Sequence, residues 1–343
     1  MLESLFSGRR TVFIAEIGIN HNGDIATAEK MIEKASEAGA DAVKFQTFIP
    51  EMMNSPFTSS LMNGDAEPVK DYSTTDFFST FTFREEEWAG LKKKSEECGL
   101  VFFSAPFDAP SVELLEKIGV SLYKVASSEV TNPPLLKKIA ETGKPVILST
   151  GMSREEEIKS AITILESSGC GEIVLLHCVS LYPTDDTEAN LKRILTLKEK
   201  FNKPVGISDH SRDFYTAMIA AAFGAIVVEK HFKLTEDHDC PDKDVSLTPD
   251  QFREMIHAAE RGSLMGGDGR IEFSGRETQT ASGARRSLFA SRDIPAGTTL
   301  TGDDIICLRP GTGIPASQIY NYTGKKTKNN IKEGAILRPE YFI

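Results

Sequence analysis

Two histidines stand at the ends of apolar runs, where a side chain able to bind a metal or a proton is conspicuous. His210 ends "PVGISDH" (204–210), and His231 follows Glu229 and Lys230 in "VVEKHF" (227–232). Two imidazoles with carboxylates nearby suit a divalent transition metal that keeps open coordination positions. Because side chains alternate along a strand, we expect Glu229 and His231 to share the inner face and Lys230 to point outward, toward a helix.

Three lysines lie inside or at the edge of apolar runs. They are Lys44 in "AVKFQTF", Lys124 in "LYKVAS", and Lys230. A buried ammonium group is costly unless an anion accompanies it. Serines follow several of the same runs and add neutral donors. The pattern therefore predicts a pocket that binds a phosphate and a carboxylate through charge-assisted hydrogen bonds.

Short apolar runs that favour strands alternate with amphipathic segments that favour helices, such as 25–38, 84–98, 153–167 and 212–222. Most helical segments end in a glycine, which is typical of a helix C-cap. Alternating strands and helices imply a parallel sheet, and eight such units match a (β/α)8 TIM barrel. A doubly wound sheet is the alternative, but "EIGINHNGD" lacks the dinucleotide fingerprint. The eight predicted strands are 12–18, 42–48, 101–107, 122–127, 145–150, 172–179, 204–210 and 226–232.

The barrel explains why polar residues at the strand ends matter. In this fold the carboxyl ends of the strands meet at one mouth, where the active site lies. The polar side chains at those ends are Glu16, Asn20, His21, Lys44, Gln46, Ser104, Lys124, Ser127, Glu129, Ser149, Thr150, Ser180, Tyr182, Ser208, Asp209, His210, Glu229, Lys230 and His231.

The alternation of strands and helices is interrupted at two places. Residues 49–83 form a long excursion after the second strand, which predicts a lid or rim for the pocket. After residue 262 the chain becomes rich in Gly and Ser, and short strands and turns follow. We predict a barrel domain over 1–262, a linker over 263–284 and a small β-rich domain over 285–343.

Composition excludes several classes of function. The 343 residues carry a formal charge of −11, which disfavours nucleic acid or an anionic membrane as the main partner. Five scattered cysteines lack metal-type spacing and are odd in number, which argues against a disulfide framework. No run is long enough to span a membrane, and "MLESLFSGRR" lacks an apolar signal core, so we expect a cytoplasmic protein.

Eight ordered motifs resemble one known family. "AEIGINHNGD", "GADAVKFQT", "SAPFD", "KVASSE", "ILSTGM", "LHCVSLYPT", "GISDHS" and "VEKHF" are similar to the bacterial sialic acid synthases, which make N-acetylneuraminic, legionaminic and pseudaminic acids. "RRSLFASRDIPAGTTLTGDDI" and "RPGTGI" resemble their C-terminal antifreeze-like (SAF) domain. The resemblance implies condensation of phosphoenolpyruvate with an N-acyl amino hexose, such as N-acetylmannosamine, to a nine-carbon 2-keto acid with release of phosphate.

The resemblance also implies roles for individual residues. A divalent ion, Mn²⁺ or Mg²⁺, is expected on His210 and His231, and Glu129 near the cationic carbon. Glu16 is expected to act beside them in catalysis and to contact the sugar. Arg309 is expected to reach the sugar in the barrel of a partner subunit, which implies a domain-swapped homodimer. The residues implied for phosphoenolpyruvate are Lys44, Lys124, Ser127, Ser149, Ser180 and Ser208, and those for the sugar include Gln46, Tyr182 and Asp242.

Several alternatives stay open. Some relatives have Asn at Ser180 and Thr at Ala105, so either phosphate contact can differ here. The acceptor can be N-acetylmannosamine or a 2,4-diacetamido relative, giving legionaminic or pseudaminic acid. Another phosphoenolpyruvate aldol synthase that uses a phosphosugar, a metal-dependent pyruvate aldolase, and an inactive carbohydrate-binding barrel are the competing functions.

Overall fold

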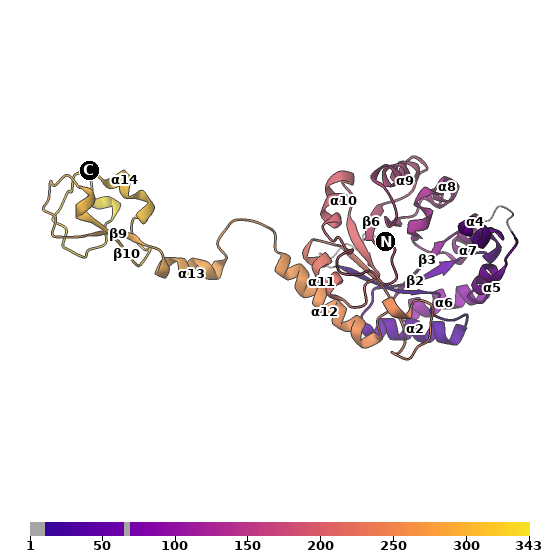
Figure 1. Cartoon of the computed structure of the whole chain (residues 1–343). Coiled ribbons are helices and arrows are strands. Elements are labelled where there is room, and N and C mark those ends of the chain that lie inside the picture. Colours follow the sequence, from indigo (N-terminus) through magenta and orange to yellow (C-terminus); the bar gives the residue numbers. More distant parts are fainter. Residues whose placement is uncertain (1–10, 65–68) are drawn as a thin grey trace. The chain divides into compact units, whose positions relative to one another are not determined.

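A computed structural model describes residues 11–64 and 69–343, which form two compact units, one ending at Gly267 and the other spanning Asp268–Ile343 (Figure 1). The predicted absence of a signal core concerns residues 1–10, which lie outside the described residues.

The first unit is the predicted barrel. Its parallel strands close in sequence order, each pairing with the next and β8 with β1. The eight predicted strands are all confirmed, with ends that differ by at most two residues. The strands are β1 (Val12–Gly18), β2 (Ala42–Thr47), β3 (Val101–Pro106), β4 (Tyr123–Val125), β5 (Val146–Ser149), β6 (Ile173–Cys178), β7 (Val205–Asp209) and β8 (Val227–His231).

A helix follows each strand and covers the outside of the barrel (Figure 1). The sequence sets their ends: Asp24 caps the first helix by accepting the N–H of Thr27, and Gly39 ends it with a φ of 94°. The covering helices are α2 (Ile25–Ala38), α6 (Glu85–Glu97), α7 (Ala109–Ile118), α8 (Pro133–Ala140), α9 (Glu155–Ser167), α10 (Arg193–Phe201), α11 (Tyr215–Ala222) and α12 (Pro249–Gly266), with 3-10 turns at Ser127–Thr131 and Lys243–Val245.

Alternation along the strands divides the barrel interior into two layers. On β1 the inward residues are Val12 and Ile14, then Glu16. On β8 they are Val227, then Glu229 and His231. The apolar inward residues form a floor, and the polar ones stand above it at the carboxyl ends. The floor consists of Val12, Ile14, Ala42, Phe103, Leu122, Ile147, Val174, Leu176 and Val227.

The excursion after β2 carries three short helices, α3 (Pro50–Met53), α4 (Thr58–Asn63) and α5 (Ser73–Ser79). Residues 65–68 of it lie outside the described part of the chain. Phe81, at its end, is buried against Phe48 and Ile19 beside the mouth of the barrel. The excursion thus packs on the rim, and a role as a lid stays a prediction.

The second unit is small and has its own apolar core. It contains α13 (Gly275–Ala284), α14 (Ile319–Tyr322) and an antiparallel pair, β9 (Ser287–Ala290) and β10 (Ile305–Leu308), with 3-10 turns at Gly302–Asp304, Ala316–Gln318 and Pro339–Tyr341. Leu288, Leu300 and Leu337 are among its buried residues. The predicted linker, 263–284, contains the end of α12 and all of α13. Throughout residues 11–64 and 69–343, no helix is both long and apolar enough to cross a bilayer.

A buried histidine supports the rim from below. The His21 side chain is fully buried, its Nδ1 accepts the N–H of Gly23 at 3.0 Å, and its ring lies 4.6 Å from that of Phe83, centroid to centroid. Burial lowers the pKa of His21 to about 4. The folded protein therefore holds this imidazole in its neutral form.

Acid should weaken the first unit through His21. Its pKa is about 6.5 when unfolded and about 4 when folded, so the stabilisation is complete above pH 6.5 and is lost as the pH falls toward 4. The expected loss from this group is about 3 kcal/mol of unfolding free energy. Urea unfolding of the wild type and His21→Phe at pH 7 and pH 4.5 measures it. Between pH 7 and pH 4.5, His21→Phe should lose less unfolding free energy than the wild type. The control His257→Phe, at an exposed position of α12, should lose as much as the wild type. Equal losses in all three proteins would contradict the assignment.

Candidate active site

A cavity of about 300 Å³ lies at the carboxyl ends of the strands. Every strand of the barrel, or the residues directly after it, contributes to its wall. This is where the sequence placed the pocket, because the inward residue at the top of each strand is polar or ionisable in most cases. The lining residues are Glu16, Lys44, Gln46, Ala105, Phe107, Lys124, Ala126, Ser127, Ser128, Ser149, Met152, Cys178, Ser180, Tyr182, Ser208, His210, Glu229 and His231.

Three of the predicted site residues do not line this cavity. Glu129 lies on the 3-10 turn after β4, where its carboxylate accepts hydrogen bonds from Ser128 (3.0 Å) and Asn132 (2.7 Å). Asp242 stands behind His231, with 3.3 Å between its Oδ2 and the imidazole Nδ1. Arg309 belongs to the second unit. The predicted roles of these three residues stay predictions.

A network of buried ion pairs lies among the residues that line the cavity. Lys44 Nζ lies 2.8 Å from Glu16 Oε1 and 3.8 Å from Glu229 Oε1. Lys124 Nζ donates to the same Glu229 oxygen at 2.8 Å, and Ser208 Oγ donates to it at 2.9 Å. We expected a substrate anion to accompany these lysines. The chain supplies the anions itself, so a bound substrate adds to an arrangement that is already charge-paired.

The surroundings keep Glu229 and Lys44 in their charged forms. Burial alone would raise the pKa of Glu229, but the adjacent ammonium groups of Lys124 and Lys44 outweigh it and hold the pKa below its ordinary value. Burial would likewise lower the pKa of Lys44, yet Glu16 and Glu229 raise it. Both groups therefore carry their charges at neutral pH.

Four buried polar atoms of residues that line the cavity have no hydrogen-bond partner among the described residues. They are Glu16 Oε2, Glu229 Oε2, Ser149 Oγ and His231 Nδ1. Buried polar groups are nearly always hydrogen-bonded, and an unpaired one costs about 1–3 kcal/mol. Such atoms beside a cavity mark places where a ligand can complete the hydrogen bonding.

The two imidazoles meet at the mouth, as predicted for neighbouring strands. The ring centroids of His210 and His231 are 5.4 Å apart, and Tyr182 stacks on His210 at 4.1 Å. His210 Nδ1 lies 2.8 Å from the carbonyl oxygen of Val179 and donates to it in the neutral tautomer. That bond leaves Nε2 of His210 with its lone pair free, because a neutral imidazole has one N–H.

The donor set fits a divalent ion bound by two imidazoles. His210 Nδ1 is hydrogen-bonded to a backbone carbonyl, the kind of support that metal-binding histidines commonly have, and the carboxylate of Asp242 lies 3.3 Å from His231 Nδ1. Within residues 11–64 and 69–343, no group of three or more His, Cys, Asp or Glu side chains could hold a metal. An ion held at this pair would therefore keep positions open for substrate and water.

Lys230 faces away from the cavity, as its place in the alternation predicts. Its ammonium group is fully buried and pairs with Asp209 Oδ2 at 3.0 Å. It also donates to the backbone carbonyl of Ser211. Its partners are thus strand β7 and the loop after it, rather than the helix that we expected.

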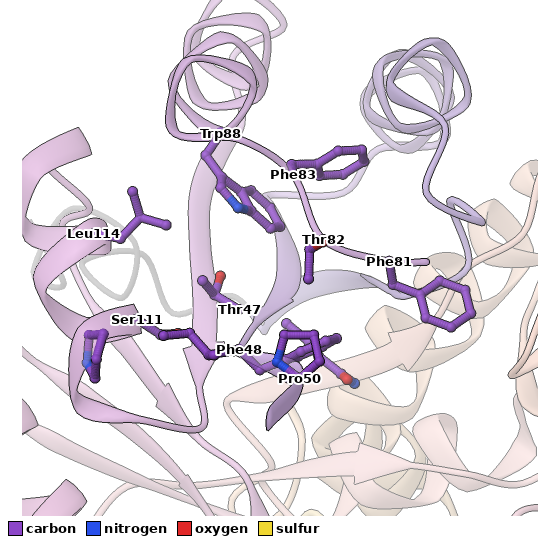
Figure 2. Close-up of a pocket in the computed structure, with 12 residues that line it drawn as sticks. Thr47, Phe48, Pro50, Phe81, Thr82, Phe83, Trp88, Ser111 and Leu114 are labelled. Atoms are coloured by element: carbon purple, nitrogen blue, oxygen red, sulfur yellow. The ribbon is translucent and has the colours of Figure 1, made fainter. Parts of the chain in front are cut away.

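A second cavity of about 300 Å³ differs in character (Figure 2). Figure 2 shows Leu114 on one side of it and Phe81 on the other, with Trp88 and Thr82 between them. Of the described residues that line it, none has an ionisable side chain. It offers no acid, base or charge for the predicted reaction, so the polar cavity is the candidate active site.

Some lining residues have positions or contacts that the sequence pattern does not predict. Glu229 was placed on the inner face by alternation, but its bridging of two lysines was not predicted. Met152 and Phe107 lie in loops after β5 and β3, and Cys178 ends an apolar strand. A positive φ of 53° at Met152 is unusual for a side chain of this kind and is common near functional sites. Nothing in the sequence pattern alone signalled it.

Family comparisons agree with this geometry. The NeuB family model matches residues 31–270, and the SAF domain model matches residues 285–342. The chain therefore belongs to the NeuB family, and its second unit is the predicted SAF domain. It is an enzyme of the sialic acid synthase type.

Individual relatives cover nearly the whole chain. N,N'-diacetyllegionaminic acid synthase of Campylobacter jejuni is 36% identical over 96% of this chain and 99% of its own. Pseudaminic acid synthase of the same species is 34% identical over 96% of both chains. The crystal structure of N-acetylneuraminic acid (sialic acid) synthetase from Leptospira borgpetersenii, in complex with citrate, is 34% identical and matches with a TM-score of 0.71, covering 80% of this chain and 91% of that one.

Manganese binding tests the imidazole pair. If the pair binds the ion as predicted, replacing His210 with Ala would remove one of its two protein ligands, and the affinity for Mn²⁺ should fall by about tenfold or more. Isothermal titration of metal-free protein with Mn²⁺ measures this directly. His257→Ala, at an exposed position of α12, is the control and should bind Mn²⁺ as the wild type does. Unchanged affinity in His210→Ala would place the metal elsewhere.

Proposed function

We propose that this protein condenses phosphoenolpyruvate with an unphosphorylated N-acyl amino hexose, giving a nine-carbon 2-keto acid and phosphate. The observation that carries the proposal is the order of side chains around the cavity: serine donors come from the ends of β4 to β6, whereas the carboxylates of Glu229 and Glu16 come from β8 and β1. Family membership supports the reaction class, and the arrangement of this donor wall and this acceptor wall supports the choice of substrates.

The donor wall suits phosphoenolpyruvate. Ser149 Oγ has no partner, and Ser127 Oγ accepts the N–H of Gly151 at 3.0 Å, so both hydroxyl hydrogens are free to be donated. A Cβ at Gly151 would lie 2.3 Å from Ser180 Oγ and 2.8 Å from Ser127 Oγ, so only glycine lets these serines gather. With Lys124 beside them, the wall offers what phosphate and carboxylate oxygens require.

The acceptor wall suits a sugar. Glu16 Oε2 and Glu229 Oε2 are carboxylate oxygens, which only accept hydrogen bonds when ionised. Fully ionised phosphoenolpyruvate has no hydrogen to donate, so it cannot satisfy them. Sugar hydroxyl groups can. Gln46 Nε2 lies 3.4 Å from Glu16 Oε1 and brings an amide to the same wall.

The chemistry follows from this division. Carbon 3 of phosphoenolpyruvate attacks the aldehyde carbon of the open-chain sugar, and water adds to carbon 2 before phosphate leaves through carbon–oxygen cleavage. Lys44 and Lys124 hold the phosphoenolpyruvate anion, and Glu16 orients the sugar hydroxyls. His210 and His231 would hold a divalent ion, which would supply Lewis-acid polarisation of the aldehyde oxygen.

The position of Glu129 bears on how the cationic carbon 2 is stabilised. We assign that role to a carboxylate, because opposite charge close to carbon 2 lowers the barrier. The family resemblance gives this role to Glu129, and we retain it as part of the proposal. Glu16 and Glu229 line the cavity and provide the same charge from the acceptor wall.

A phosphorylated acceptor is less compatible with the cavity. Among the described residues that line the cavity, the basic side chains of the lysine and arginine type are Lys44 and Lys124. Both already pair with carboxylates. A second phosphate would need a further basic group. Unphosphorylated sugars need no further basic group. N-acetylmannosamine and the 2,4-diacetamido hexoses are such sugars, and they lead to neuraminic, legionaminic or pseudaminic acid.

A substrate panel tests the proposal. Phosphate release is measured with phosphoenolpyruvate and each of N-acetylmannosamine, its 6-phosphate and the 2,4-diacetamido hexoses. We expect release with at least one unphosphorylated sugar and consumption of phosphoenolpyruvate in equal amount. Activity only with a phosphorylated aldose, or only with pyruvate, would reject the proposal, and binding of a sugar without any turnover would favour an inactive carbohydrate-binding barrel.

Replacing Glu129 with Ala tests whether this carboxylate, or the carboxylates that line the cavity, stabilise carbon 2. If this carboxylate reaches the reacting carbon in the working complex, kcat should fall by about a hundredfold or more while the circular dichroism spectrum is unchanged. Asn132→Ala removes only its hydrogen-bond partner and should have a much smaller effect. Full activity in Glu129→Ala would leave the role to the carboxylates that line the cavity.

Removal of residues 285–343 tests the role proposed for Arg309. If a partner subunit's SAF domain completes the sugar site of a homodimer, truncation should raise the KM for the sugar far more than that for phosphoenolpyruvate. Arg309→Ala in the full chain should reproduce the effect. Equal changes in both KM values would argue for a purely structural domain.

A further inference from the structure

Glu229 contacts three of the side chains expected to bind phosphoenolpyruvate. Its Oε1 accepts from Lys124 at 2.8 Å and from Ser208 at 2.9 Å, and it lies 3.8 Å from Lys44. The side chain is buried, and Ser208 is its register partner on β7. One carboxylate oxygen thus connects strands β2, β4, β7 and β8.

Two ammonium groups cannot approach one point in a buried site without an anion between them. Lys44 has two carboxylates nearby, Glu16 and Glu229, whereas the ion pair of Lys124 is with Glu229. Burial lowers the pKa of Lys124, and Glu229 is the main group that opposes this effect. Glu229 therefore favours the charged form of Lys124, and their hydrogen bond fixes where the remaining hydrogens of this ammonium group point.

The other oxygen of Glu229 argues against a purely structural role. A buried carboxylate that serves only the fold has both oxygens hydrogen-bonded, as Asp209 does through Lys230 and Ser211. Glu229 Oε2 has no partner among the described residues and belongs to a side chain that lines the cavity.

We propose that Glu229 is a positioning residue for phosphoenolpyruvate. It holds Lys44, Lys124 and Ser208 from below, so that their free hydrogens face a substrate anion bound above them. This inference rests on the proposed function, because it assumes that phosphoenolpyruvate is the anion. The support comes from behind the lysines, in the way that outer contacts orient a metal ligand.

The direction in which Glu229→Gln changes the affinity for phosphoenolpyruvate separates a positioning role from simple charge repulsion. If Glu229 only repelled the substrate, Glu229→Gln would remove a negative charge and phosphoenolpyruvate would bind more tightly. If it positions the lysines, the same change leaves Lys124 without its ionic partner, and binding becomes about tenfold weaker. The KM of the sugar should rise as well, because Glu229 Oε2 belongs to the acceptor wall, so the Kd of phosphoenolpyruvate measured without sugar is the quantity that reports on the lysines.

Isothermal titration of the full-length protein with phosphoenolpyruvate alone is the test. We expect Glu229→Gln to raise the Kd about tenfold and Glu229→Asp, which keeps the charge on a shorter side chain, to give an intermediate value. Asp209→Asn is the matched control, since it breaks another buried lysine–carboxylate pair on the outer face. It should lower the melting temperature and leave the Kd within about twofold.

Each outcome has one meaning. Equal or tighter binding in Glu229→Gln would overturn the proposal, and so would an equal loss in Asp209→Asn. If Glu229→Gln does not fold, Glu229→Asp decides, because a Kd equal to that of the wild type would contradict positioning. Failure of the wild type itself to bind phosphoenolpyruvate would instead overturn the proposed function.

Discussion

Charge burial at the top of the barrel is the constraint on which the site depends. Lys44, Lys124, Glu16 and Glu229 are all buried, and each finds an opposite charge within 4 Å. Removing one member of such a group leaves an uncompensated charge, at a cost of about 3–5 kcal/mol. The network is therefore fixed before any substrate arrives, which limits where an anion can bind and which hydrogens it can meet.

The barrel makes this network possible through strand parity. The same inward face that carries Val12 and Ile14 at the bottom carries Glu16 at the top, and β8 repeats the pattern with Val227 below Glu229. The apolar floor excludes water from beneath the charged layer, which strengthens electrostatic contacts above it. The loops then add the groups that alternation cannot supply, such as Ser127, Tyr182 and His210.

Much of this arrangement was predictable because it depends on period-two alternation and on strand order. The strands, the mouth of the barrel, the imidazole pair and the outward direction of Lys230 follow from local pattern. The pairing of Lys124 with Glu229 does not, since the two residues are 105 positions apart and lie on strands that are not neighbours. Glu129 illustrates a second limit: it follows the three-residue strand β4 on a 3-10 turn, where alternation no longer indicates direction. The helix α13 in the predicted linker forms from a sequence whose Gly and Ser content favours irregular structure, and its N-terminus is stabilised by a capping box at Ser274.

The division of the cavity into a donor wall and an acceptor wall is the central claim, and a crystal structure with phosphoenolpyruvate tests it most directly. The account predicts phosphate and carboxylate oxygens within hydrogen-bond distance of Lys124 and Ser149, with Glu229 still in contact with both lysines. Electron density for the ligand against Glu16 and away from the serines, or lysine side chains that turn from the cavity, would contradict it.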